Sequence, residues 1–179
     1  PKGIDAGIQA LMARAFDSGE KLETIWGNTE LAKKCSDISA KMKKCRRDFN
    51  GSKQAASLNA IAGMISPEKA AKKTILPGGA KDFSTFYGYY MLEALALAGC
   101  YTEAIDLGAT TFWEDFNLDW TKNAARIDEL VPEGKVDIHS SYGNYCYKGF
   151  RHSLCHGWAS GPTTWLSAHV LGVNVLEPG

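Results

Sequence analysis

The 179-residue sequence lacks any excess of charge of one sign. Its 20 Lys and Arg residues are balanced by 20 Asp and Glu residues, so the formal net charge is zero. Binding to nucleic acid or to an anionic membrane surface usually depends on a strong positive field. The composition gives no reason to expect either partner, and any ligand has to be inferred from local groups of residues.

The sequence also lacks a cysteine framework and a long apolar run. Its five cysteines are an odd number without a C-x-x-C pair, which argues against a disulfide scaffold and a cysteine-rich zinc site. No apolar stretch approaches the roughly 20 residues that cross a bilayer, and residues 1–5 carry no signal-peptide pattern. The start is typical of the middle of a longer chain, so the compartment stays open.

What the sequence does contain is apolar residues at helical spacing, with almost no sign of strands. Residues 4–16 and 31–49 predict two amphipathic helices. Ser52 is suited to cap a third helix, and Ser66 followed by Pro67 marks the start of a fourth.

The second half of the chain predicts further helices. Residues 82–99 form an aromatic and apolar helical pattern that ends at a glycine, and Thr102 starts a short helix. Pro162 suits the first turn of a last helix that ends at Gly172. About seven helices, many in consecutive pairs, predict an all-α helical-hairpin array.

Two groups of aromatic and polar residues border a long polar segment, residues 114–151. They are residues 110–116 (T-T-F-W-E-D-F) and 153–162 (S-L-C-H-G-W-A-S-G-P). A sugar site needs flat apolar rings and a few carboxylate or imidazole groups. Taken alone, however, Trp113 and Trp158 fit core anchors equally well, and Glu114 can simply cap or solvate a helix end.

The two groups resemble the paired signatures T-T-x-W-E and S-L-x-H of α-L-rhamnosidase-type glycoside hydrolases. Residues 82–90 (D-F-S-T-F-Y-G-Y-Y) resemble the helix before the first signature, and residues 165–173 resemble the exit toward a closing β-domain. The resemblance covers most of residues 50–179. Two departures are a short connection between Gly99 and Gly108 and a cysteine, Cys155, where asparagine is frequent in relatives.

The resemblance implies a six-hairpin (α/α)6 toroid around a sugar site. Residues 1–172 would be the C-terminal part of this catalytic barrel, and residues 173–179 the start of a linker or the closing β-domain. The imperfect alternation of Val173, Val175 and Leu176 by itself suits the start of a strand. Because a full ring of helices averaging about 11 to 12 residues needs well over roughly 200 residues, the chain would supply about half of it. The expected partner is the missing half of the barrel, or a second copy in a homo-oligomer.

The resemblance also implies inverting hydrolysis of terminal α-L-rhamnose from an oligosaccharide or glycoside. Glu114 matches the general base, His156 matches a histidine that contacts the sugar, and Trp113 and Trp158 would wall a pocket for the sugar's methyl group. The family's general acid lies upstream and has no match here, so we predict that residues 1–179 alone do not hydrolyse rhamnosides. No cofactor is expected, and a periplasmic or secreted location fits the family.

Other interpretations stay open. His152 and His156 would share a helix face beside Cys155, but the chain lacks the glutamate of the H-E-x-x-H motif and a fourth ligand, so a zinc site is disfavoured. A different class of function is a non-catalytic helical-hairpin module that binds protein or glycan. A nearer alternative is a six-hairpin hydrolase or lyase that acts on another sugar.

Overall fold

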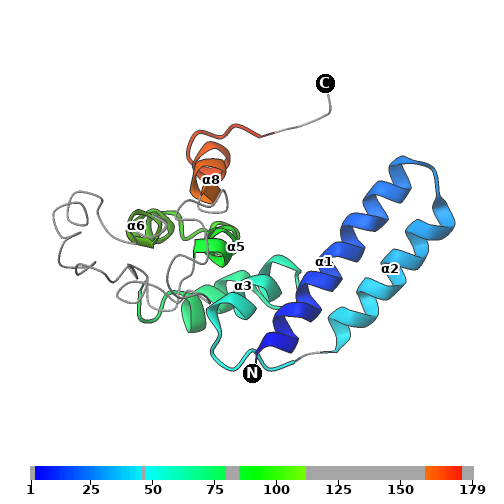
Figure 1. Cartoon of the computed structure of the whole chain (residues 1–179), viewed down its shortest axis with the longest axis horizontal. Coiled ribbons are helices and arrows are strands. Elements are labelled where there is room, and N and C mark those ends of the chain that lie inside the picture. The colour runs from blue at the N-terminus through cyan, green and yellow to red at the C-terminus, as the bar shows by residue number, and fades with distance from the viewer. Residues whose placement is uncertain (1–2, 46, 80–84, 112–159, 175–179) are drawn as a thin grey trace, which may run out of the picture. The chain divides into compact units, whose positions relative to one another are not determined.

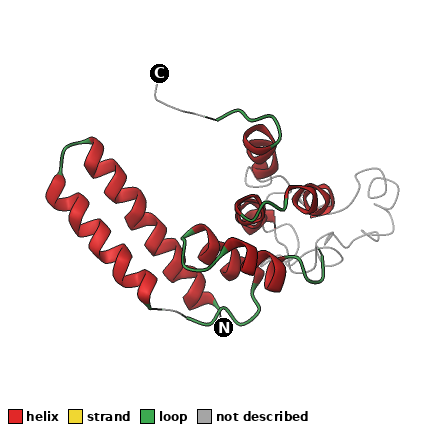
Figure 2. Ribbon diagram, turned by 180° about the vertical axis from the view of Figure 1, so that it is seen from behind, coloured by secondary structure: helices red, strands yellow, loops and turns green. Residues whose placement is uncertain are grey.

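The structure is a computed structural model that describes residues 3–45, 47–79, 85–111 and 160–174. All regular structure within these ranges is helical (Figure 2). The elements are α1 (Ile4–Ile25), α2 (Thr29–Lys44), α3 (Lys53–Ile61), α4 (Pro67–Ala70), the π-helical segment η1 (Ala71–Ile75), α5 (Thr85–Leu97), α6 (Tyr101–Thr111) and α8 (Gly161–His169). For the described residues, the prediction of an all-α chain with about seven α-helices is confirmed.

The chain divides into two compact units. One contains Pro1–Pro77 and Glu93–Cys100, and the other contains Gly78–Leu92 and Tyr101–Gly179. The boundary therefore falls within α5, whose residues up to Leu92 belong to the second unit.

The long α1–α2 hairpin is the main feature of the first unit (Figure 1). Gly27 turns the chain between the helices with a φ of +78°. Asp17 of α1 accepts hydrogen bonds from Ser39 at 2.6 Å and from Lys43 at 2.7 Å, both on α2. The buried residues of α1 are all small: Ala6, Gly7, Ala10 and Ala13.

The predicted helix caps are confirmed. The Ser52 hydroxyl accepts from the Ala55 amide at 3.2 Å, and the Ser66 hydroxyl accepts from the Lys69 amide at 3.2 Å. The apolar pattern predicted a helix that continues to residue 49, but α2 ends at Lys44. The next residue, Cys45, has an extended backbone conformation.

A buried asparagine connects α3 to α1. Asn59 donates to the Ala6 carbonyl of α1 at 3.2 Å and to the Ala55 carbonyl of its own helix at 2.8 Å. Its side chain is only 4% exposed, so these hydrogen bonds replace the water that the amide loses on folding. The contact fixes how far α3 slides along α1.

The prediction for α1 is correct about the helix but wrong about its buried face. Ile4, Ile8 and Met12 of the apolar stripe are about half exposed. The buried face of α1 instead carries small residues, and two of them, Ala6 and Gly7, lie against α3. At the other end of the hairpin, further large apolar side chains are exposed: Leu22, Ile25, Trp26 and Leu31.

The second unit is built on the start of α5 together with α6 and α8. The helix α5 is apolar on all sides, which is typical of a helix in a core, and Met91 and Leu92 are buried. The predicted terminal glycines Gly99 and Gly172 adopt φ values of +72° and +74°, the left-handed region that favours glycine. Val173, where a strand was expected to begin, has no regular structure.

Candidate functional site

The four candidate site residues lie outside the described residues. Trp113, Glu114, His156 and Trp158 all fall within residues 112–159. The structure does describe the two helices to which their segments are joined. The chain leaves the described part at the end of α6 and returns to it one residue before α8.

The first signature begins inside a helix. Residues 110 and 111, the first two of this signature, are the last residues of α6. The sequence predicted only a short helix from Thr102, whereas α6 fills the connection from Tyr101 to Thr111. Glu114 therefore follows the end of α6 by three residues in the sequence.

Contacts within the second unit fix the direction of α8. At its start, a Cβ placed on Gly161 would lie 2.9 Å from the Cβ of Tyr89 in α5. Further along α8, the rings of Trp165 and His169 lie with their centres 6.4 Å and 6.2 Å from the ring of Tyr101, the first residue of α6. Thus α8 begins beside the first half of α5 and runs toward the start of α6.

The helices α5 and α6 are connected by only residues 98–100, a length typical of antiparallel neighbours. Within the second unit, the start of α8 lies beside Tyr89 in the first half of α5. We call this region the motif end, because the second signature segment is joined to the start of α8.

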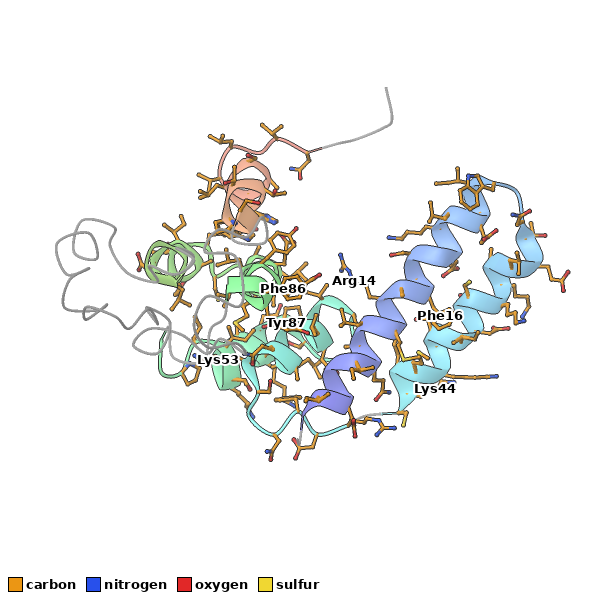
Figure 3. All side chains as sticks on the ribbon, viewed as in Figure 1. Arg14, Phe16, Lys44, Lys53, Phe86 and Tyr87 are labelled. Carbon is orange, nitrogen blue, oxygen red and sulfur yellow. The ribbon has the colours of Figure 1, made fainter. Side chains whose placement is uncertain are left out.

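Four aromatic residues gather at the motif end, near the start of α5. The ring centres of Phe86 and Tyr87 are 5.0 Å apart, those of Tyr89 and Tyr90 are 5.6 Å apart, and Phe86 and Tyr87 each lie 6.2 Å from Tyr90. Figure 3 shows Phe86 and Tyr87 as sticks on this part of the ribbon. The Phe86 side chain is 45% exposed. The sequence indicated only a helical face here.

Trp165 is the anchor of α8. It is 1% exposed, and its ring centre lies 5.2 Å from that of His169. Its indole nitrogen is buried and finds no hydrogen-bond partner within the described ranges. A buried indole that packs between helices holds α8 in place even though its N–H is unsatisfied.

The charged cluster around Asp17, in the first unit, is structural. Burial alone would raise the pKa of Asp17, but hydrogen bonds from Lys43 and Ser39, with the charges of Lys43 and Lys21, outweigh it and hold the pKa below its ordinary value. Asp17 is therefore a carboxylate at neutral pH. Its contacts tie two helices together and leave no carboxylate pair for catalysis.

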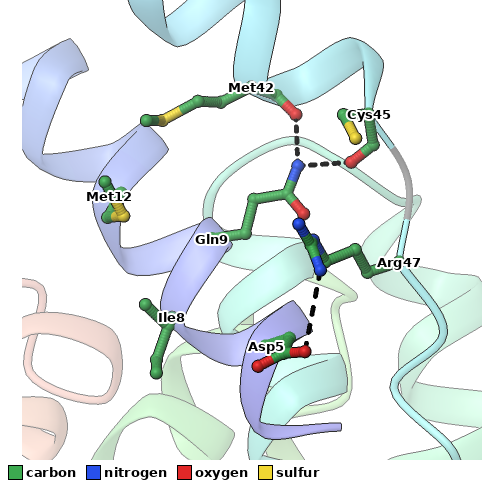
Figure 4. Close-up of a pocket in the computed structure, with 7 residues that line it drawn as sticks. All are labelled: Asp5, Ile8, Gln9, Met12, Met42, Cys45 and Arg47. Atoms are coloured by element: carbon green, nitrogen blue, oxygen red, sulfur yellow. Dashed lines mark hydrogen bonds and ion pairs between the residues drawn. The ribbon is translucent and has the colours of Figure 1, made fainter.

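A groove of about 430 Å³ lies along the α1–α2 hairpin (Figure 4). The Gln9 amide nitrogen donates to the Met42 carbonyl at 2.6 Å and to the Cys45 carbonyl, and Arg47 pairs with Asp5 at 3.6 Å. The lining holds this single carboxylate, already paired with a guanidinium, and not the two carboxyl groups that glycoside hydrolysis uses. We assign the groove no catalytic role.

Comparisons of the chain with protein-family models, curated protein sequences and solved structures found no match. None of the described helices has both the length and the apolar character that a bilayer-spanning segment needs. In the same part of the chain, no three His, Cys, Asp or Glu side chains gather as a metal site would require. Function is therefore inferred from the two signatures and from the helices that carry them.

Proposed function

We propose that this chain is the C-terminal part of the catalytic (α/α)6 barrel of a glycoside hydrolase that removes terminal α-L-rhamnose with inversion. The observation that carries the proposal is the pair of signatures and the helices to which they are joined. The first signature follows α6 and the second precedes α8, and the rings of Tyr101 in α6 and Trp165 in α8 lie with their centres 6.4 Å apart in one helical unit. That arrangement is what two halves of one sugar site need.

The described helices fit such a barrel in a second respect. Half a ring of hairpins leaves apolar helix faces without the neighbours that would cover them in the whole domain. On α1, Ile4, Ile8 and Met12 are 50%, 51% and 45% exposed. The missing half of the barrel, or a second copy, would cover this face.

In the proposed mechanism Glu114 is the general base. Its carboxylate takes a proton from water as the water attacks the anomeric carbon, while a carboxylic acid from outside this chain protonates the leaving oxygen. The two carboxyl groups need a separation of roughly 6.5 to 9.5 Å to leave room for that water. His156 hydrogen-bonds the sugar, and Trp113 and Trp158 enclose its methyl side. No cofactor takes part.

The test is hydrolysis of an aryl α-L-rhamnoside by the complete polypeptide that contains this chain. Glu114→Gln should lower kcat about 10²- to 10⁴-fold, because the amide cannot accept the proton from water. The matched control is Glu103→Gln. Glu103 is an exposed carboxylate near the start of α6, so its replacement should leave kcat unchanged. Equal rates for the two variants would refute the role of Glu114.

Two further measurements separate the alternatives. Residues 1–179 alone should show no turnover, because the general acid is supplied from elsewhere. A panel of aryl glycosides of other sugars tests the nearer alternative, a six-hairpin enzyme with another specificity. If the complete polypeptide hydrolyses none of them but binds glycans or a protein, the non-catalytic hairpin module is the correct interpretation.

A further inference from the structure

The exposed face of α1 carries apolar residues along the whole helix. Seven positions follow the alternating spacing of four and three residues that marks the seam of a coiled coil. These residues, which we call the outer seam, are Ile4, Ile8, Leu11, Ala15, Ser18, Leu22 and Ile25. Four of the large side chains are about half exposed or more: Ile4 at 50%, Ile8 at 51%, Leu22 at 49% and Ile25 at 77%.

The packed face of α1 lies on the opposite side of the helix. Ala6, Ala10 and Ala13 are at most 1% exposed, and Asp17 accepts hydrogen bonds from two residues of α2. At 3.6 residues per turn, these four positions lie about half a turn away from the outer seam. A surface helix normally carries polar residues on the side opposite its packed face. Large apolar residues at coiled-coil spacing on that side therefore indicate a partner helix.

We propose that the outer seam pairs with the same seam of a second copy of this chain, in a parallel contact of two helices about a two-fold axis. A second copy presents the same three heptads in register, so each Ile or Leu of the seam meets its own counterpart. The small residues Ala15 and Ser18 occupy the middle of the contact. The inference uses no residue of the two signatures and does not depend on the proposed function.

The residues that flank the outer seam favour the parallel orientation. Arg14 and Lys21, both exposed, lie on one side of the seam. The other side carries Asp5, Met12, Gly19 and Trp26. In a parallel pair these two sides face each other, which places Lys21 of one copy beside the Trp26 ring of the other, where an ammonium group is attracted to the indole. In an antiparallel pair like sides meet, so Arg14 and Lys21 would approach the same cations of the second copy.

The size of the outer seam predicts a reversible dimer. A helix of 22 residues is about 33 Å long, and a contact one helix diameter wide, about 10 Å, covers on the order of 300 Å² of each copy. Met12 and Trp26, 45% and 66% exposed, widen the contact on one side. Stable complexes bury about 800 Å² of each partner, so we expect a dissociation constant in the micromolar range.

The first test is sedimentation velocity of the 179-residue chain from about 1 µM to about 1 mM, where the wild type should pass from monomer to dimer. Leu22→Glu should raise the dissociation constant at least about tenfold, because two carboxylates then face each other across the two-fold axis. The matched control is Leu31→Glu. Leu31 has the same 49% exposure at the same end of the hairpin but lies on α2, so the dimer should persist. Far-UV circular dichroism checks that both variants stay helical.

The second test is cross-linking of Ile25→Cys by oxidation with diamide, followed by trypsin digestion. The tryptic peptide of residues 22–33 contains no native cysteine, so mass spectrometry identifies a disulfide between two copies of it. This self-linked peptide should form faster than in the control Leu31→Cys, which changes the same peptide outside the seam.

Three results overturn the proposal. A chain that stays monomeric over the whole concentration range leaves the outer seam to another part of a longer polypeptide. A dimer that Leu22→Glu and Leu31→Glu weaken equally does not use the seam. A dimer in which Ile25→Cys self-links no faster than Leu31→Cys is not the parallel pair. In each case the proposed hydrolysis is untouched.

Discussion

Replacement of Asp17 by alanine tests the contact that holds the α1–α2 hairpin in register. The carboxylate accepts from Ser39 at 2.6 Å and from Lys43 at 2.7 Å. The Ser39 side chain is 2% exposed, and a buried hydroxyl left without its partner costs about 1 to 3 kcal/mol. The pair with Lys43 is one-third exposed, so solvent screening limits its contribution to about 0.2 to 1 kcal/mol. Asp17→Ala should therefore destabilise the protein by about 1 to 4 kcal/mol.

Urea unfolding followed by circular dichroism at pH 7 measures this loss. Asp17→Asn should cost less, because the amide oxygen still accepts from Ser39 while the charge is gone. The control is Asp37→Ala, which breaks an exposed pair with Lys33 on one face of α2 and should cost under about 0.5 kcal/mol. If Asp17→Ala costs no more than Asp37→Ala, the cluster does not hold the hairpin.

The pH dependence of stability follows from the same group. The pKa of Asp17 in the folded protein lies below its ordinary value of 3.8. A lowered pKa stabilises the folded state fully above that ordinary value, and the contribution disappears as the pH falls through the folded pKa. Unfolding free energies measured from pH 6 downward should fall more steeply below pH 3.8 in the wild type than in Asp17→Asn. Parallel curves would contradict the assignment.

The remaining stability predictions concern helix contacts, each measured by thermal unfolding. Gly161→Ala should destabilise the protein by about 1 to 3 kcal/mol, because the new Cβ would lie 2.9 Å from that of Tyr89. A Cβ at Gly7 meets nothing closer than 3.6 Å, so Gly7→Ala should be neutral or stabilise the protein by up to about 1 kcal/mol. Equal effects of the two substitutions would show that α8 does not pack tightly on α5. Asn59→Ala should cost about 1 to 3 kcal/mol, since it removes the hydrogen bond from α3 to α1, and an unchanged midpoint would rule that contact out as a source of stability.

Features of the fold that depend on local sequence were predictable. Ser52 and Ser66 cap helices because each hydroxyl accepts a hydrogen bond from the backbone amide three residues later. This contact does not depend on what surrounds the helix. Gly99 and Gly172 follow helix ends for a similarly local reason, the left-handed backbone. The number and class of the elements followed from these signals.

Features that depend on contacts between distant residues were not predictable. The helix α1 buries small residues, of which Ala6 and Gly7 lie against α3, and leaves Ile4 and Ile8 exposed, so the strongest apolar stripe did not mark the buried face. The contact of Gly161 with Tyr89 joins residues far apart in the sequence, and the spacing of apolar residues does not predict it. The candidate site was predicted from two short signatures, and the structure adds the helix ends that carry them.

The most direct test of the central claim is the configuration of the first sugar released. With the complete polypeptide and an aryl α-L-rhamnoside, ¹H NMR spectra taken before mutarotation should show β-L-rhamnose first, because Glu114 as a general base directs water to the face opposite the leaving group. Initial release of α-L-rhamnose would contradict the account, since it would require a carboxylate that acts as a nucleophile.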